Sequence, residues 1–294
     1  MARRSFWQIR GYGILLVLSA IWGLAFVAIR RADFELSPIN LALLRWLVAS
    51  AGFLVAAPFI GKSEKKLVRQ DIPRLLVISL LNVPIYHLSL NSAEKTVSSG
   101  LAGFLTSLGP IFIAIFSAYL LKEKIGRRLV LALAGGMIGA LVLSLPDLGS
   151  GGSIIGPLEV VLAALSFATF SVLSKPLVLK YGSAPITIWA GLTGTIMLLP
   201  LLSPSFLTEV AILSIAGWLS ILYLSLLSTV IGYLLFYKLV SRGAMSRLSI
   251  QLYLIPVISV IGGIFLLQES LNFNTIMGGA IILLSIAFTT KSGN

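Results

Sequence analysis

Cysteine is absent from the 294-residue chain, and histidine occurs once. The lack of cysteine excludes disulfide bonds, thiolate zinc sites and cysteine nucleophiles, and one histidine leaves no HExxH motif and no histidine cluster. Charged residues make up 11% of the chain, whereas a soluble domain carries about 25%. The composition therefore predicts no metal and no cofactor, and it argues against an enzyme.

Apolar residues are correspondingly abundant. They make up 57% of the chain, and the mean hydropathy is +1.02. One soluble core of this length could not bury so much apolar surface, so the predicted solvent is a lipid bilayer. The net charge of +12 could suggest nucleic acid. However, the basic residues fall in short loops, which is typical of topology signals and contacts with anionic lipid, and we predict no nucleic-acid partner.

Ten apolar runs are long enough, or nearly long enough, to span a membrane, which takes about 20 residues. They are Tyr12–Ile29, Pro38–Ile60, Leu75–Leu90, Val97–Leu121, Leu129–Leu145, Gly156–Leu173, Ala184–Leu202, Ile212–Leu239, Leu248–Leu267 and Thr275–Thr289. The first run follows three arginines, as a signal peptide would, but it has spanning length and no A-x-A-like cleavage site. We predict that it remains as the first helix.

The positions of the lysine and arginine residues support a count of ten spans. Eighteen of the 22 basic residues fall on one side of the membrane if there are ten spans, Arg30, Arg31 and Lys95 fall on the other, and Arg45 lies within a span. The positive-inside rule then predicts a multi-pass protein of the cell (plasma) membrane with both termini in the cytoplasm. The short loops leave no room for a separate soluble domain.

The chain also contains an internal repeat. A shift of 146 residues places Pro110 on Pro256 and Glu123 on Glu269, and shifts of 145 and 147 align the first two spans of each half. We predict a first repeat over 1–145, a glycine- and serine-rich linker over 146–153 and a second repeat over 154–294. Five spans per half is an odd number, so the second half enters the membrane from the opposite side. The predicted fold is an all-α integral membrane protein, with two inverted five-helix repeats around a central cavity.

Several residues carry a resemblance to a known family. They are Trp22–Gly23, Arg30–Arg31, Pro38, Arg45, Ala93, Ser98–Ser99, Pro110 and Glu123, with Ala244, Pro256, Glu269 and Gly278–Gly279 in the second half. On these residues the chain resembles the drug/metabolite transporter superfamily, in particular the EamA type with two tandem EamA domains. The resemblance implies a basket of ten helices with spans five and ten at its periphery. It also implies export or exchange of amino acids, their analogues, nucleotide sugars or other metabolites. One departure is that Lys122 and Gln268 replace the usual glycine before the two glutamates.

The candidates for a substrate cavity are polar or aromatic side chains on spans expected to face the bundle interior. They are Trp22, Phe26, Arg45, Asn82, Tyr86, His87, Phe104, Ser107, Phe167, Phe170, Tyr233, Tyr237 and Gln251. The same side chains could instead join neighbouring helices or pack as ordinary aromatic residues. Pro110 and Pro256 lie inside spans at equivalent positions, and we predict that they act as hinges.

Arg45 lies seven residues inside the second span. An arginine at such a depth costs about 2.5–3.5 kcal/mol on insertion scales, so it should have a reason to be there. It could snorkel to the outer interface, bind a carbonyl of another helix, or bind the carboxylate of a substrate. No acidic residue is predicted near the middle of a span, which favours a facilitator or exchanger over an ion-driven pump.

Together these features predict a transporter that exports or exchanges a small-molecule substrate, with amino acids or related compounds as the best match. The alternatives are an integral-membrane enzyme acting on lipid-linked substrates, and a membrane scaffold or receptor. The first would need acidic or histidine residues clustered at one face, and the second a long loop or soluble domain. The pair Gly278–Gly279 could support a homodimer or close packing within one chain.

Overall fold

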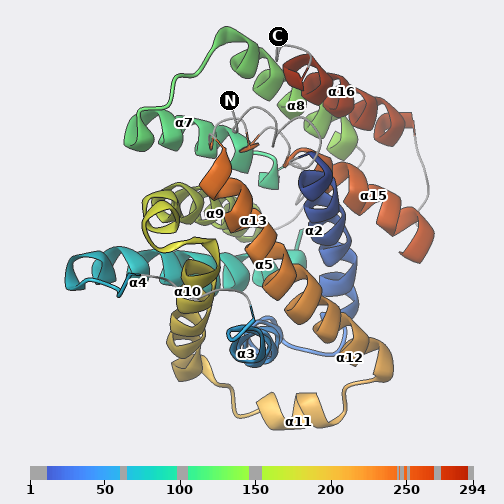
Figure 1. Ribbon diagram of the computed structural model, residues 1–294. Coiled ribbons are helices and arrows are strands. Elements are labelled where there is room, and N and C mark those ends of the chain that lie inside the picture. Colours follow the sequence, from blue (N-terminus) through green and yellow to red (C-terminus); the bar gives the residue numbers. More distant parts are fainter. Residues whose placement is uncertain are drawn as a thin grey trace.

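The structure is a computed structural model that describes residues 12–59, 65–97, 105–145, 154–243, 245, 248–249, 252–267 and 273–290. These residues are mostly α-helical, with two π-helical segments, short 3-10 turns and no strand among them (Figure 1). The predicted linker 146–153 and the candidate residues Phe104 and Gln251 lie outside the described residues.

The helices follow the order of the predicted spans. The first half holds α2 (Tyr12–Ala32), α3 (Pro38–Ala56), α4 (Ile72–Leu80), a π-helical segment (Leu81–Ile85), α5 (Tyr86–Glu94), α7 (Gly109–Leu121) and α8 (Arg127–Ser144). The second half holds α9 (Ile155–Tyr181), α10 (Ser183–Leu198), α11 (Phe206–Ala211), α12 (Ile215–Leu222), a π-helical segment (Tyr223–Ile231), α13 (Gly232–Arg242), α15 (Leu254–Leu267) and α16 (Phe273–Thr290).

Each predicted span overlaps a helix among the described residues. Six helical segments in this part of the chain are long and apolar enough to cross a membrane, and α4 and α5, like α12 and α13, join through their π-helical segments into one such span. Shorter apolar helices, such as Gly109–Leu121, account for further spans. The predicted all-helical membrane fold is therefore confirmed, while the number of ten spans stays a prediction.

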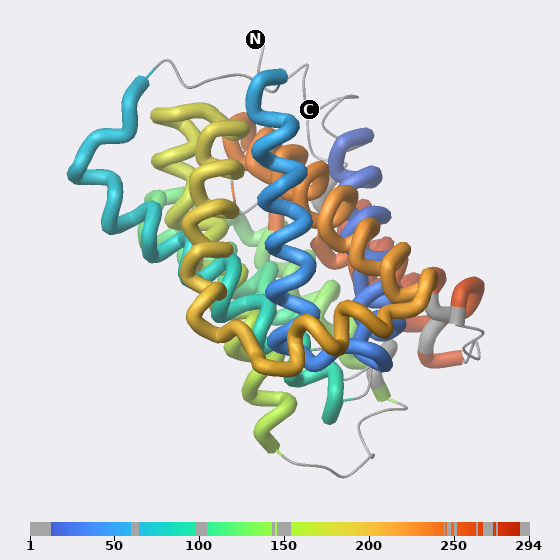
Figure 2. Tube along the Cα trace, turned by 90° about the horizontal axis from the view of Figure 1, so that it is seen from below, coloured from blue at the N-terminus to red at the C-terminus, as the bar shows by residue number. Residues whose placement is uncertain are grey.

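The helix packing repeats between the two halves. Helix α2 packs on α15, and its counterpart α9 packs on α7; α3 contacts the π-helical segment Tyr223–Ile231, and its counterpart α10 contacts the π-helical segment Leu81–Ile85. Seen from below, α3 runs between α10 and the continuous helix of α12 and α13 (Figure 2). The contacts are thus exchanged between the halves, as expected for two copies of one unit.

Helices α8 and α16 pack against each other at one edge of the molecule (Figure 1). Glycine allows their close approach, because a Cβ on Gly139 would lie 2.8 Å from the carbonyl oxygen of Gly278. The sequence left open whether Gly278–Gly279 serves a dimer or packing within one chain. The contact that the structure describes for this pair is within the chain.

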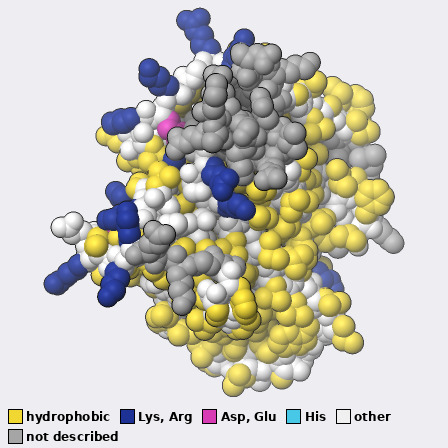
Figure 3. Space-filling view, in the orientation of Figure 1, with side chains coloured by type: hydrophobic (Ala, Val, Ile, Leu, Met, Phe, Trp, Pro, Cys, Tyr) yellow, Lys and Arg dark blue, Asp and Glu magenta, His cyan; other side chains and the backbone are white. Residues whose placement is uncertain are grey.

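Large apolar side chains cover much of the molecular surface. Ile196 on α10, Leu219 on α12 and Leu284 on α16 are each more than 60% exposed. A soluble monomer seldom exposes large contiguous apolar patches, whereas a bilayer solvates them. In Figure 3 most of the visible lysine and arginine side chains gather at the top and left, and apolar atoms cover most of the right and lower surface.

Candidate functional site

A pocket lies between the two halves of the chain. Its lining residues come from α2, α3, α5, the start of α7, α9, the second π-helical segment with α13, and the start of α15. They are Trp22, Ala25, Phe26, Ile29, Arg45, Tyr86, His87, Leu90, Thr106, Ser107, Gly109, Pro110, Ala164, Phe167, Ser228, Tyr233, Leu252, Ile255 and Pro256. Both repeats therefore contribute to one cavity.

Ten of the residues singled out from the sequence meet in this pocket. They are Trp22, Phe26, Arg45, Tyr86, His87, Ser107, Phe167 and Tyr233, together with Pro110 and Pro256. Asn82, Phe170 and Tyr237 are buried but do not line it. Phe170 stands behind the wall, with its ring 5.1 Å from Phe167 and 6.3 Å from Tyr233.

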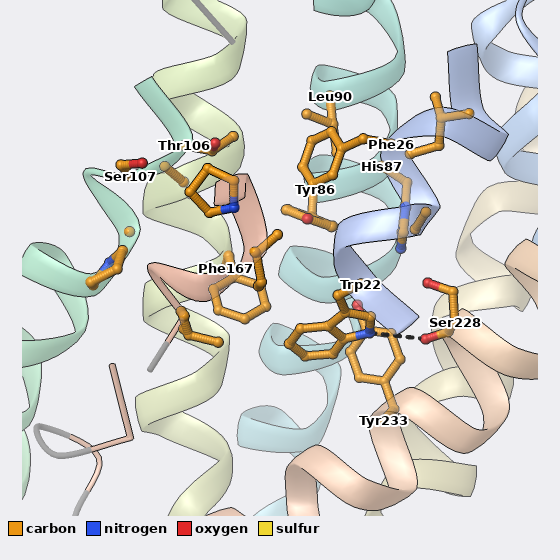
Figure 4. A pocket seen from close by; sticks show the side chains of 18 of the residues that line it. Trp22, Phe26, Tyr86, His87, Leu90, Thr106, Ser107, Phe167, Ser228 and Tyr233 are labelled. Atoms are coloured by element: carbon orange, nitrogen blue, oxygen red, sulfur yellow. Dashed lines mark hydrogen bonds between the residues drawn. The ribbon is translucent and has the colours of Figure 1, made fainter. Parts of the chain in front are cut away.

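Aromatic rings make up one wall of the pocket (Figure 4). The ring of Trp22 stands edge-on to Phe167 at 5.8 Å and to Tyr233 at 5.7 Å, and Tyr86 lies 5.7 Å from Phe167. Such edge-to-face pairs are worth about 0.5–1.5 kcal/mol each beyond their apolar burial. The rings thus support one another, and the wall presents ring faces and edges to whatever fills the cavity.

Irregular backbone supports this wall at the second π-helical segment. The indole nitrogen of Trp22 donates a hydrogen bond of 3.0 Å to the backbone oxygen of Ser228 (Figure 4). A Cβ on Gly232 would lie 2.6 Å from that nitrogen, so the absence of a side chain lets the indole reach the backbone. Short π-helical segments often mark functional sites, and they leave carbonyl groups free for other donors.

Arg45 is 4% exposed and points into the protein. Its Nε donates to the hydroxyl of Thr229 at 2.9 Å, and its Nη2 donates to the hydroxyl of Ser228 at 3.2 Å. The side chain thus does not snorkel to the outer interface, and its partners on the other helix are hydroxyl groups rather than carbonyls.

The two prolines lie where helices begin and not inside continuous helices. Pro110 is the second residue of α7 and Pro256 the third residue of α15. Turn residues at 107–108 precede α7, and Ile111 and Phe112 donate to the carbonyl of Leu108 at 3.0 Å. A proline in the first helical turn lacks only an N–H that would have no partner there. Among the described residues, turn residues precede each of the two helices shortly before its proline, so neither proline kinks a continuous helix. The hinge role stays a prediction.

Buried polar side chains in and next to the wall have atoms without a hydrogen-bond partner among the described residues. These atoms are both ring nitrogens of His87, and the indole nitrogen of Trp46 and the hydroxyl of Tyr237, whose rings lie next to Tyr233. His87 lies between Tyr86 at 4.8 Å and Trp46 at 5.3 Å. Each unpaired buried polar atom costs about 1–3 kcal/mol of folding free energy. Atoms left unpaired in this way are often ones that bind a ligand or a water molecule.

Ion pairs join the two halves at the end that the sequence predicts to be cytoplasmic. Glu123 Oε1 accepts from Lys175 Nζ at 2.6 Å and from the backbone N–H of Met245 at 3.0 Å. Lys180 pairs with Asp71 at 2.6 Å. Glu123 thus ties the end of α7 to α9 and to the segment that follows α13.

Carboxylates also join the halves at the opposite end. Glu35 accepts from the N–H and hydroxyl of Ser214 at 2.7 Å, and these bonds lower the pKa of Glu35. Burial raises the pKa of Glu209, but hydrogen bonds outweigh this effect and the pKa is lowered; its main donor is the N–H of Ser37 at 2.8 Å. By contrast, burial raises the pKa of Asp33 to about 6, although Lys95 opposes the shift. Polar contacts thus join the two halves at both ends of the molecule.

Sequence reasoning missed part of the lining, chiefly its small and aliphatic members. Ala25 and Ile29 share a helical face with Trp22, and Leu90 follows Tyr86 by one turn. The i, i+3, i+4 and i+7 spacing would have identified them once one residue of the face was placed. Among the described residues, no group of three His, Asp or Glu side chains could hold a metal ion.

A polar and aromatic pocket between two repeats of an all-helical membrane fold is typical of membrane transporters. A family model described as the EamA-like transporter family matches residues 9–145 and 154–291. The chain belongs to this family, and it is a multi-pass membrane transporter.

Relatives agree with this assignment. An uncharacterized transporter of Archaeoglobus fulgidus is 34% identical over 95% of this chain and 98% of its own length, and the uncharacterized transporter YdfC of Bacillus subtilis is 32% identical over 93% and 88%. A protein of Streptantibioticus cattleyicolor named a probable terminal-alkyne amino-acid exporter is 28% identical over 90% and 89%. A crystal structure that is 21% identical over 96% of both chains shares the fold, with a TM-score of 0.79.

Proposed function

We propose that this transporter exports or exchanges small metabolites, amino acids or related compounds, by alternating access. The observation that carries the proposal is the shared pocket: Trp22 and Tyr86 from the first repeat face Phe167 and Tyr233 from the second. A site at the interface of two repeats can be exposed to either side when one repeat rocks against the other. The name of the relative from Streptantibioticus cattleyicolor supports amino acids as the class of cargo.

The charge of the lining supports a facilitator or exchanger over an ion-driven pump. Among the described lining residues there is no Asp or Glu that could take up a proton or sodium ion in the cavity. The same feature weighs against an enzyme that acts on lipid-linked substrates, because such an enzyme would need clustered acidic or histidine residues, and His87 is the one such residue in the described lining. The contacts at the two ends of the molecule suit alternate closure, since each joins a loop of one half to the other half.

The test is counterflow of radiolabelled amino acids in liposomes that contain the purified full-length protein. We expect saturable exchange for at least one apolar or aromatic amino acid, with little change when pH or sodium gradients are imposed. Phe167→Ala should reduce the rate at least tenfold, because it removes part of the wall. Phe265→Ala is the matched control, since Phe265 is 79% exposed on α15 and should leave the rate unchanged. Absence of saturable flux for every compound of a broad metabolite panel would contradict the proposal.

A further inference from the structure

Among the described residues, no carboxylate forms an ion pair with Arg45. The ion pairs in the part of the chain that the structure describes are Arg31–Glu35, Lys95–Asp33, Lys175–Glu123 and Lys180–Asp71, and none of them includes Arg45. Its hydrogen-bond partners among the described residues are the neutral hydroxyls of Ser228 and Thr229. Glu94 influences Arg45 electrostatically, but it does not come within 4.0 Å. A buried cation held only by hydroxyls is costly unless an anion completes its surroundings.

The two hydroxyls also fix the orientation of the guanidinium. They hold Nε and Nη2, and thus one side of the planar fork, against the π-helical segment Tyr223–Ile231. A guanidinium offers five N–H donors, of which these two bonds use two. Arg45 lines the pocket, so the remaining donors are those that a ligand there can reach. Planar donors held in this way match the two oxygens of a carboxylate.

The rest of the lining describes the other part of the ligand. Trp22, Tyr86, Phe167 and Tyr233 form an aromatic wall, and Leu90 and Ile255 add aliphatic surface. The described residues of the lining include no Asp or Glu to pair with an ammonium group. A positive group on the ligand could therefore meet only ring faces, hydroxyls or backbone carbonyls.

We propose that Arg45 is the anchor for a ligand carboxylate, and that the pocket takes apolar or aromatic monocarboxylates whether or not they carry an amino group. The proposal rests on the pocket being the substrate site of the proposed function, and it defines the chemical class more sharply. An amino acid is then recognised by its carboxylate and its side chain, while its ammonium group contributes little. The amide and the amine of the same skeleton lack the anion and are rejected.

Binding to the full-length wild-type protein tests the proposal before any variant is made. The probes share one phenyl group: 3-phenylpropionate, L-phenylalanine and N-acetyl-L-phenylalanine carry a carboxylate, whereas 3-phenylpropanamide and 2-phenylethylamine do not. We expect the three carboxylates to bind with affinities within about tenfold of one another, measured by calorimetry in detergent. The amide and the amine should bind at least tenfold more weakly, since a lost charge-assisted pair reduces affinity roughly tenfold to a hundredfold.

Variants then assign the effect to Arg45. Arg45→Gln should remove the preference for the carboxylate over the amide, and Arg45→Lys should retain part of it, because the ammonium keeps the charge but lacks the planar fork. Arg31→Gln is the matched control, since Arg31 loses the same charge outside the pocket and should keep the wild-type preference.

The outcomes separate this proposal from the proposed function. Equal binding of the amide and the carboxylate to the wild-type protein, an unchanged preference in Arg45→Gln, or no carboxylate-dependent binding at millimolar probe would each overturn the anchor. Saturable transport of amines or amides would overturn the anchor while leaving the transport function intact. Arg45-dependent binding of carboxylates without any flux would support the anchor and count against transport.

Discussion

Tyr86 and Tyr233 are 147 residues apart in the sequence and line the same pocket from opposite repeats. Each follows a π-helical segment: Tyr86 comes directly after Leu81–Ile85, and Tyr233 is the second residue after Tyr223–Ile231. The same offset superposes Pro38 on Pro185. Each repeat therefore has a π-helical segment and a tyrosine at the equivalent position, and the two tyrosines meet in the pocket between the repeats.

The crossing of α10 with the first π-helical segment depends on Gly194. A Cβ there would lie 2.3 Å from Val83 Cγ2 and 2.9 Å from the backbone oxygen of Ser79. Because backbone cannot yield as a flexible side chain does, Gly194→Ala should lower the free energy of unfolding by about 1–3 kcal/mol. The measurement is thermal unfolding in detergent. Gly279→Ala is the control, since nothing lies within 4 Å of its added Cβ, and an equal loss in both variants would contradict the packing argument.

The sequence predicted the fold well because hydropathy and charge are repeated along the whole chain. A run of apolar residues in lipid has to satisfy its own backbone, so a helix follows with few alternatives. The π-helical segments could not be predicted in the same way. Leu81–Ile85 contains Pro84, but Tyr223–Ile231 contains neither proline nor glycine, and its register is set by tertiary contacts such as the bond from Trp22 to Ser228.

The candidate site was predicted in part. Polar and aromatic residues such as Trp22 and Tyr233 are conspicuous in a hydrophobic chain, because each needs a reason to be in lipid. The direction of each side chain depends on helix rotation, which composition does not reveal. Phe170 and Phe167 are three residues apart on α9, yet the first is fully buried behind the wall and the second lines the pocket. The partners of Arg45 likewise required the packing of α3 on the π-helical segment.

Lys122 ends α7 in the left-handed region, with φ of 55°. This position is where the resemblance to EamA-type transporters leads one to expect glycine, and the turn lets Glu123 reach Lys175. The left-handed conformation costs a residue with a Cβ roughly 1–2 kcal/mol. Lys122→Gly should therefore raise the free energy of unfolding by about 0.5–1 kcal/mol.

The control for this prediction is Lys122→Ala. It also removes the contact of Lys122 with the ring of Tyr119, 5.4 Å from the ring centre, but it keeps the Cβ in the left-handed conformation. The alanine variant should therefore be no more stable than the wild type in thermal unfolding. If alanine and glycine stabilise the protein equally, the backbone conformation of Lys122 is not the cause.

The orientation in the membrane can be tested with single cysteines, because the natural chain has none. Lys124 follows α7 and Thr208 lies on α11, and both are exposed. The bias of basic residues places Lys124 in the cytoplasm and Thr208 outside. A membrane-impermeant maleimide should thus label Thr208→Cys in intact cells, and Lys124→Cys after permeabilisation. The opposite pattern would reverse the predicted orientation, and labelling of both positions in intact cells would contradict the count of spans between them.

Asp33 makes stability depend on pH in the direction opposite to that of most carboxylates. It directly follows α2, its side chain is 10% exposed, and burial raises its pKa from 3.8 to about 6. The charged groups near it are Lys95, Glu94 and, on its own helix, Arg30 and Arg31. Because the folded protein holds this proton more tightly than the unfolded chain, the free energy of unfolding should rise by about 1 kcal/mol as pH falls from about 7 to about 5.

The comparison of wild type with Asp33→Asn isolates the effect of this carboxylate, since groups that do not interact with Asp33 cancel in the difference. Glu35 and Glu209 have lowered pKa values, so the stability that they contribute is lost only below their ordinary value of 4.5, outside the window. Thermal unfolding at several pH values should therefore show a gain for the wild type toward pH 5 that the asparagine variant lacks. Asparagine cannot carry the charge, so it should also be the more stable protein at pH 7. Parallel pH profiles for the two proteins would mean that Asp33 has its ordinary pKa, and that Lys95 compensates its burial in full.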